Sequence, residues 1–258
     1  MNREELKEYV GTTAFSLGHV EKDYIQHIIL GSLSRNWSGY LVFKGGTALQ
    51  KIGLINRFSE DLDFTEKHDI SPDKLADVVV KSIESYNYPV EVDEFSDKEI
   101  TSGFRVKVEG PLYRNNRGLC SIRLEISRRE EVLKQPTRKE IDPPYRDVLP
   151  YVIKVMDKDE IAAEKVRAIL TRDKVRDVYD LYKLIENDAT IDREIIEKKL
   201  EYYEMELEKS EFIQRVIELS NRWDTDLRSL MDIVPEKEKV LETVISEMKA
   251  LGNTSDES

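Results

Sequence analysis

The spacing of hydrophobic residues changes once along this chain, near residue 156, and that change limits the possible folds more than any other feature. Before it, short stretches alternate apolar and polar residues with the period of two typical of β-strands, between stretches of helical spacing. From Asp157 onward every stretch has helical spacing, and Pro235 is the sole proline. We therefore expect an α+β fold in which residues 1–156 form a mixed β-sheet domain with flanking helices and residues 157–258 form an all-α helical domain.

Apolar spacing and turn residues also predict the individual elements. In the first domain we expect helices over 22–35, 48–52 and 72–86 and strands at 41–43, 61–64, 104–108, 120–126 and 152–155. Four prolines make 131–150 a long connection. In the second domain we expect helices over 157–172, 177–186, 192–207, 210–231 and 236–250. The tail after residue 251 is expected to be disordered.

Composition excludes several classes of protein. Charged residues make up 36% of the chain and hydrophobic residues 40%, as in globular proteins with a buried core. We expect a cytoplasmic protein, because no apolar run approaches the ~18 residues of a membrane span and the N-terminus lacks a signal-peptide pattern. One cysteine and three histidines exclude an intramolecular disulfide and a cysteine-rich zinc site. Any metal would need oxygen ligands, which indicates Mg²⁺ or Mn²⁺.

The strongest chemical signal is a pair of glycines followed by two aspartates. A strand ends at Gly45-Gly46 and a helix follows, with Thr47 as its expected N-cap, so free N–H groups could face a phosphate. Strand alternation then directs Asp61 and Asp63 to one face. Two adjacent carboxylates repel each other unless a cation lies between them, so this pattern favours a divalent metal site.

Glu125 is the expected third carboxylate. It lies on the polar face of the strand at 120–126, together with Arg123. A site with two metal ions needs more ligands than two aspartates supply, which favours a ligand role for Glu125. The alternative is an Arg123–Glu125 ion pair on an exposed sheet face.

Three segments together carry a family resemblance: Phe43-Lys44-Gly45-Gly46-Thr47-Ala48-Leu49, Ser59-Glu60-Asp61-Leu62-Asp63-Phe64, and 160–168 followed by Arg176-Asp177-Val178-Tyr179-Asp180-Leu181. They resemble the AbiEii/AbiGii nucleotidyltransferase toxins of the DNA polymerase β-like superfamily. The resemblance implies an NTP substrate, transfer to an RNA such as tRNA, Mg²⁺ or Mn²⁺ as cofactor, and an antitoxin encoded alongside, without any membrane partner. One departure is Gly46, which stands where many superfamily members have serine, so a side-chain phosphate contact there would have to come from Thr47.

The resemblance also implies roles for individual residues. The expected catalytic residues are Asp61, Asp63, Glu125, Lys165 and Asp177, of which the first three would bind metal. The expected nucleotide-binding residues are Lys44, Gly45, Gly46, Thr47, Ser59, Lys165 and Arg176.

Two of these residues also have ordinary structural explanations. Lys165 lies at the edge of the apolar stripe of its helix, where a lysine usually extends to solvent, although beside a triphosphate it would neutralise developing charge. Asp177 is suited to cap the next helix, or to orient Lys165 or accept a proton. Asp180 is expected to pair with Arg176 or Lys183.

The interpretation is a metal-dependent nucleotidyltransferase that acts as a toxin. The alternatives are a non-catalytic nucleotide-binding regulator and a transferase that modifies a protein or a small molecule. No Ser-His-Asp or Walker-type pattern is present, and His27, within an apolar helix, is expected to be a core residue.

Overall fold

A seven-stranded mixed sheet organises the first part of the computed structural model, which describes residues 1–11, 15–115 and 118–252. Its strands are β1 (Leu41–Lys44), β2 (Leu62–Glu66), β3 (Val90–Asp97), β4 (Thr101–Val108), β5 (Cys120–Ser127), β6 (Thr137–Ile141) and β7 (Tyr151–Val155). They follow the order β3-β4-β5-β2-β1-β7-β6. β2 pairs with β5, and β1 with β7, in parallel, whereas the other neighbours are antiparallel.

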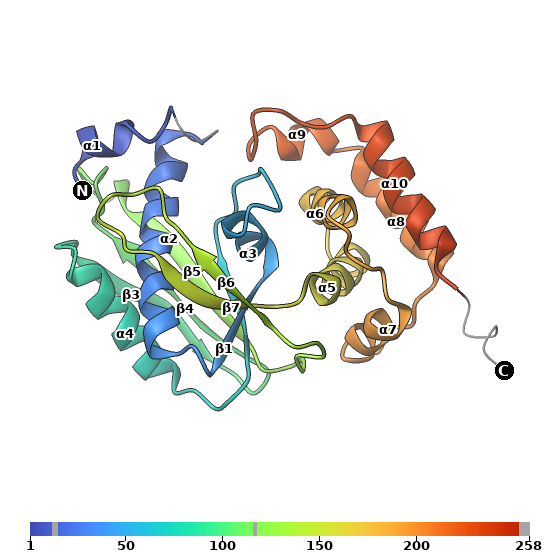
Figure 1. Cartoon of the computed structure of the whole chain (residues 1–258), viewed down its shortest axis with the longest axis horizontal. Helices are drawn as coiled ribbons and strands as arrows, with labels where there is room; N and C mark the ends of the chain where they lie inside the picture. The colour runs from blue at the N-terminus through green and yellow to red at the C-terminus, as the bar shows by residue number, and fades with distance from the viewer. Residues whose placement is uncertain (12–14, 116–117, 253–258) are drawn as a thin grey trace. The chain divides into compact units, whose positions relative to one another are not determined.

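Helices pack against this sheet, and charged side chains on β1, β2 and β5 share its other face. The helices of this part are α1 (Arg3–Lys7), α2 (Leu17–Asn36), α3 (Gly45–Lys51) and α4 (Pro72–Glu84). α2 packs against β5 and β7, and α4 packs against β3 and β4 (Figure 1). The alternation of β5 explains why: Ile122, Leu124 and Ile126 are buried, while Arg123 and Glu125 between them are partly exposed.

Six helices form the second part of the chain as far as it is described, over residues 157–252. They are α5 (Lys158–Thr171), α6 (Val175–Glu186), α7 (Arg193–Glu201), α8 (Lys209–Ser220), α9 (Trp223–Leu227) and α10 (Lys237–Ala250). α5 packs against α6, α7 and α8, and α10 packs against α6 and α8. Contacts divide the chain into two compact units, Met1–Met156 and Asp157–Ser258. The expected tail disorder falls almost wholly on residues 253–258, which lie outside the described residues.

The α+β class and the mixed sheet are confirmed, but several elements differ from the prediction. Strands β3 and β6 were missed because both lie at the edges of the sheet and are mostly exposed, so they lack the buried alternation that marks a strand. The helix predicted over 192–207 ends at Glu201, shortly before Glu204 adopts a positive φ of 55°. The helix predicted over 210–231 is divided into α8 and α9.

The glycine turn also differs from the expected geometry. α3 begins at Gly45 rather than Ala48, with Lys44 at its N-cap position, so Thr47 is not the cap. Instead, the Thr47 hydroxyl donates a hydrogen bond to the Asp61 main-chain oxygen. β2 begins at Leu62, which leaves Asp61 just outside the strand that contains Asp63. No helix in the described part of the chain is long and apolar enough to span a membrane.

Candidate active site

Three charged residues form a row across the sheet on its polar face. Asp63 on β2 lies opposite Lys44 on β1 and opposite Glu125 on β5. Residues in register on neighbouring strands point to the same face and have Cβ atoms about 5 Å apart. The strand pairing therefore brings together two of the three expected metal ligands and one expected nucleotide-binding residue.

Asp61, unlike Asp63, does not lie on a strand. It precedes β2, and its main-chain oxygen accepts the hydrogen bond from the buried Thr47 hydroxyl. Its carboxylate makes no hydrogen bond or ion pair with any described residue. Asp61 therefore offers a carboxylate that no protein cation neutralises.

Glu125 forms the Arg123 ion pair that was one of its two expected arrangements, and it also lies beside the expected metal ligand Asp63. Its carboxylate is 3.3 Å from the Arg123 guanidinium, and the two side chains are 43% and 53% exposed. Glu125 also lies directly beside Asp63. Because an exposed ion pair contributes little free energy, the pairing with Arg123 does not prevent Glu125 from binding a cation.

The two glycines are required by neighbouring side chains. Gly45 has a φ of +73°, and a Cβ atom on it would lie 2.7 Å from Asp63 Oδ2. A Cβ atom on Gly46 would lie 2.3 Å from an Arg57 guanidinium nitrogen and 2.9 Å from Ser59 Oγ. The glycine pair was expected to leave this space for a phosphate. In the structure, side chains of the same motif lie against it.

Arg57 is a residue of this region that the sequence analysis missed. It is 1% exposed, and its guanidinium donates to the main-chain oxygen of Phe58 at 3.0 Å. A fully buried arginine is rare and needs compensating partners. Its place two residues before Ser59, at the edge of the aspartate motif, was the available signal.

The oxygen ligands of this region fit a divalent ion in chemistry and in strand placement. Asp63 and Glu125 are neighbours, Asp61 lies two residues before Asp63, and carboxylates are the donors that Mg²⁺ and Mn²⁺ prefer. Among the described residues, however, no three His, Cys, Asp or Glu side chains are already gathered closely enough to form a metal site. A three-carboxylate site would require side-chain rotation, which the exposed Glu125 permits.

The sequence suggested that Lys165 extends from a helix edge to solvent. In the structure it instead lies in a buried ionic cluster of the second unit. Its ammonium nitrogen is 2.8 Å from Asp177 Oδ1 and 2.6 Å from Asp180 Oδ2. Arg172 also donates to Asp177, at 2.8 and 2.9 Å. Although burial opposes its charge, Lys165 and Arg172 hold the pKa of Asp177 well below its usual value.

These contacts correct two further expectations. Asp177 is not an N-cap, because α6 begins two residues earlier, with Lys174 at the cap position. Asp180 pairs with Lys165 rather than with Arg176 or Lys183, because one helical turn places it on the buried face with Asp177. Arg176, the residue directly before Asp177, is half-buried.

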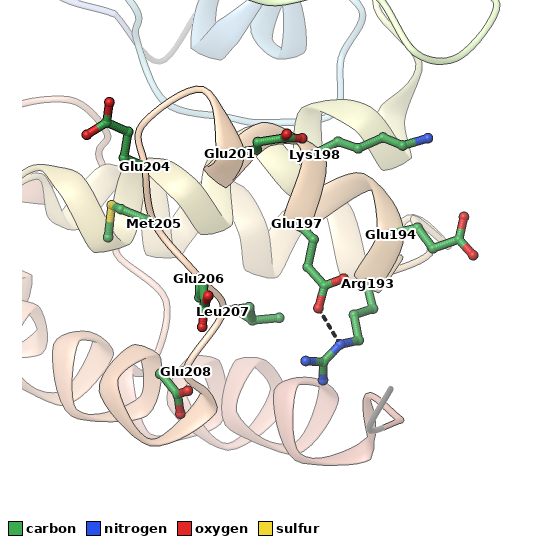
Figure 2. A pocket seen from close by; sticks show the side chains of 10 residues that line it. All are labelled: Arg193, Glu194, Glu197, Lys198, Glu201, Glu204, Met205, Glu206, Leu207 and Glu208. Atoms are coloured by element: carbon green, nitrogen blue, oxygen red, sulfur yellow. Dashed lines mark hydrogen bonds and ion pairs between the residues drawn. The ribbon is translucent and has the colours of Figure 1, made fainter. Parts of the chain in front are cut away.

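A pocket of about 860 Å³ in the second unit does not have the charge of a triphosphate site. Glutamates dominate its lining (Figure 2): Glu194, Glu197, Glu201, Glu204, Glu206 and Glu208. Only Arg193 and Lys198 oppose them, and Arg193 is already paired with Glu197 at 2.7 Å. A lining of this charge repels polyanions such as NTP and RNA.

Comparisons with known proteins agree with the fold and with the motifs. The family model described as nucleotidyl transferase AbiEii toxin, type IV toxin–antitoxin system, matches residues 29–245. MenT4, a nucleotidyltransferase toxin from Mycobacterium tuberculosis H37Rv, superposes with a TM-score of 0.65 at 20% identity, covering 98% of this chain and 91% of that one. JHP933 from Helicobacter pylori superposes with a TM-score of 0.55 at 20% identity, covering 91% and 92%.

No curated protein matches the chain. The family match, however, spans most of the sequence and includes the glycine turn, the aspartate pair and Lys165. It confirms the resemblance drawn from these motifs. The chain therefore belongs to the AbiEii family and is a nucleotidyltransferase toxin of the type IV toxin–antitoxin class.

Proposed function

We propose that this toxin transfers a nucleotidyl group from an NTP to an acceptor hydroxyl, with RNA such as tRNA as the favoured acceptor and with Mg²⁺ or Mn²⁺ as cofactor. In this reaction the acceptor oxygen forms a bond to the α-phosphorus. The bond from that phosphorus to the β-phosphate bridge breaks, pyrophosphate leaves, and the hydroxyl proton passes to solvent. The observation that carries the proposal is the direct adjacency of Asp63 and Glu125, with Asp61 two residues before Asp63.

The three carboxylates would hold the metal, and the family generally uses a divalent ion. Such an ion, when bound, supplies positive charge to the reacting phosphate oxygens. Asp61 and Asp63 would bind it on the nucleotide side, and Glu125 would bind on the acceptor side. Placement of charge and reactants is the main contribution of the protein in this chemistry.

The nucleotide would be held by residues around the glycine turn. Support comes from the first turn of α3, where the N-cap residue Lys44 makes no side-chain hydrogen bond to the amides. The amides of a first helical turn can bind a phosphate oxygen. Lys44 lies beside Asp63 and would place a positive charge near the phosphates. Thr47 would contribute its main chain only, because its hydroxyl already bonds to Asp61. Ser59 remains a proposed contact.

Lys165, Asp177 and Arg176 are proposed to take part from the second unit, on the strength of the family resemblance. Asp177 would fix the Lys165 ammonium, and Arg176 would contact phosphate. The buried ion pairs of Lys165 also give it a structural role, which the tests must separate from nucleotide binding.

A family partner, an antitoxin encoded alongside the toxin, is implied by the type IV class.

The test is incubation of the purified protein with each α-labelled NTP, with Mg²⁺ or Mn²⁺ and with total RNA, total protein or neither. We expect label in RNA with one preferred NTP, and no label with the Asp63→Asn variant. Label in protein would instead support the alternative of a transferase that modifies proteins. Absence of label together with absence of NTP binding would contradict the proposal.

A further inference from the structure

The three residues before β2 are held in place by side chains rather than by a strand ladder. Residues 59–61 have no regular secondary structure. Gln50 Oε1 accepts a hydrogen bond from the Ser59 amide at 2.8 Å, and Gln26 Nε2 donates to the Ser59 and Glu60 carbonyls, both at 2.9 Å. Thr47 donates to the next carbonyl, that of Asp61. One main-chain N–H and three successive carbonyls are thus bound by three side chains.

Gln26 is placed for this contact at a cost to stability. Its side chain is fully buried in α2, and its Oε1 atom has no hydrogen-bond partner among the described residues. Rotating the amide would bring Oε1 against two carbonyl oxygens, so the pair of carbonyls fixes its orientation. A buried amide oxygen without a partner is by itself unfavourable. The amide is therefore explained by its two carbonyl contacts.

Gln50 is fixed at both ends of its amide. Its Oε1 accepts from Ser59, and its Nε2 donates to Asp23 Oδ1 at 2.9 Å. Asp23 is itself held by Lys51 at 2.5 Å and by the Tyr145 hydroxyl at 2.8 Å. Because Asp23 and Gln26 are three residues apart on α2, one face of that helix supports the segment both directly and through Gln50.

We propose that Gln26 and Gln50 are positioning residues that fix the Asp61 carboxylate for metal binding. Asp63 needs no such device, because its register with Lys44 and Glu125 sets its place. Asp61 lies outside the strand, and the two glutamines bind the main chain of the two residues directly before it, where a ladder is missing. This inference rests on the proposed function, because it assigns Asp61 to the metal. Residues that orient metal ligands typically change affinity or activity about 10–100-fold when replaced.

The test compares Gln26→Met, which keeps the volume and removes the amide, with Ile29→Val, a mildly destabilising change in the buried face of the same helix. Gln50→Met, at a half-buried position, is the second variant and replaces Gln26→Met if that protein does not fold. Three quantities are measured: the Mn²⁺ dissociation constant by calorimetry without NTP, hydrogen exchange of the 58–63 peptide, and kcat for nucleotide transfer.

We expect both glutamine variants to weaken Mn²⁺ binding about 10–100-fold, to lower kcat by a similar factor and to speed exchange at residues 59–61, unlike Ile29→Val. Wild-type Mn²⁺ affinity in both glutamine variants, with only a lower melting temperature, would overturn the positioning role and leave the proposed function intact. Absence of Mn²⁺ binding in the wild-type protein would instead overturn the metal assignment, and with it this inference.

Discussion

Asp63 and Glu125 lie directly opposite each other on the parallel strands β2 and β5, on the polar face of the sheet. Parallel pairing of two strands that are distant in sequence is what joins the aspartate motif to a glutamate about sixty residues later. Neighbouring carboxylates repel each other, and a divalent ion removes that repulsion.

The first prediction concerns Asp61. Asp61→Asn should abolish stabilisation by Mn²⁺ while changing the free energy of unfolding without metal by no more than about 0.5 kcal/mol, because the carboxylate has no partner among the described residues to lose. The measurement is thermal unfolding with and without Mn²⁺. Asp69→Asn, at an exposed aspartate, is the matched control and should keep the wild-type response. An unchanged Mn²⁺ shift in Asp61→Asn would remove Asp61 from the metal site.

The second prediction concerns Glu125. Glu125→Gln should retain NTP binding but lose nucleotide transfer, because its proposed metal contact serves the acceptor. Its stability should change little, since the ion pair with Arg123 is about half exposed and worth at most ~1 kcal/mol. Binding is measured by calorimetry and transfer with labelled NTP.

Arg123→Gln is the control for this variant, because it breaks the same ion pair and leaves the carboxylate in place. It should keep nucleotide transfer. If Arg123→Gln and Glu125→Gln lose activity equally, the ion pair rather than a metal contact accounts for the effect.

The row of charged residues on the sheet was largely predictable, since it depends on local patterns. The alternation around Asp63 and Glu125 indicates which face each side chain takes, and the two segments become neighbours once their strands pair. Asp61 was predicted to belong to the strand but precedes it. The alternation of polar and apolar residues continues from β2 into Asp61, so it does not mark where the strand begins. The hydrogen bond from Gln26 to Ser59 joins residues 33 positions apart. It depends on tertiary packing, so no periodicity in the sequence predicts it.

The buried charges were not predictable for a related reason. Lysine at the edge of an apolar stripe usually reaches solvent, and only the packing of α5 against α6 shows that Lys165 meets Asp177 and Asp180. Arg57 was missed because its burial depends on the close approach of Gly46. Local pattern predicts which face a residue takes, whereas the partner of a buried charge is determined by tertiary contacts.

The third prediction concerns Lys165. Sequence alone suggests that Lys165→Met preserves stability, but the structure predicts a loss of about 3–5 kcal/mol, because two buried carboxylates lose their shared cation. Urea unfolding measures this loss. Lys183→Met is the control, since Lys183 forms a more exposed pair with Glu186, and it should cost less than about 1 kcal/mol. A loss for Lys165→Met as small as that of the control would contradict the buried cluster as a source of stability.

The last prediction concerns pH and His27. Burial, followed by the nearby Lys51 charge, lowers the pKa of His27 from its usual value of 6.5 to about 3. Between these values the unfolded chain binds a proton at this histidine and the folded chain does not. Stability contributed by the neutral ring is therefore complete above pH 6.5 and is lost as the pH falls toward 3.

The slope reaches up to about 1.4 kcal/mol per pH unit, so acidification from pH 6.5 to 5 should cost roughly 2 kcal/mol through His27. His27→Gln, which stays neutral and can still bond to the Tyr151 hydroxyl, should flatten the dependence between pH 5 and 6.5. His68→Gln, at an exposed histidine, should retain the wild-type slope.

The measurement is the free energy of unfolding from urea titrations at several pH values. This window lies above the usual pKa of the carboxylates, so the buried aspartates do not contribute to the difference. Equal slopes in His27→Gln and the wild-type protein would show that His27 takes up a proton in the folded state.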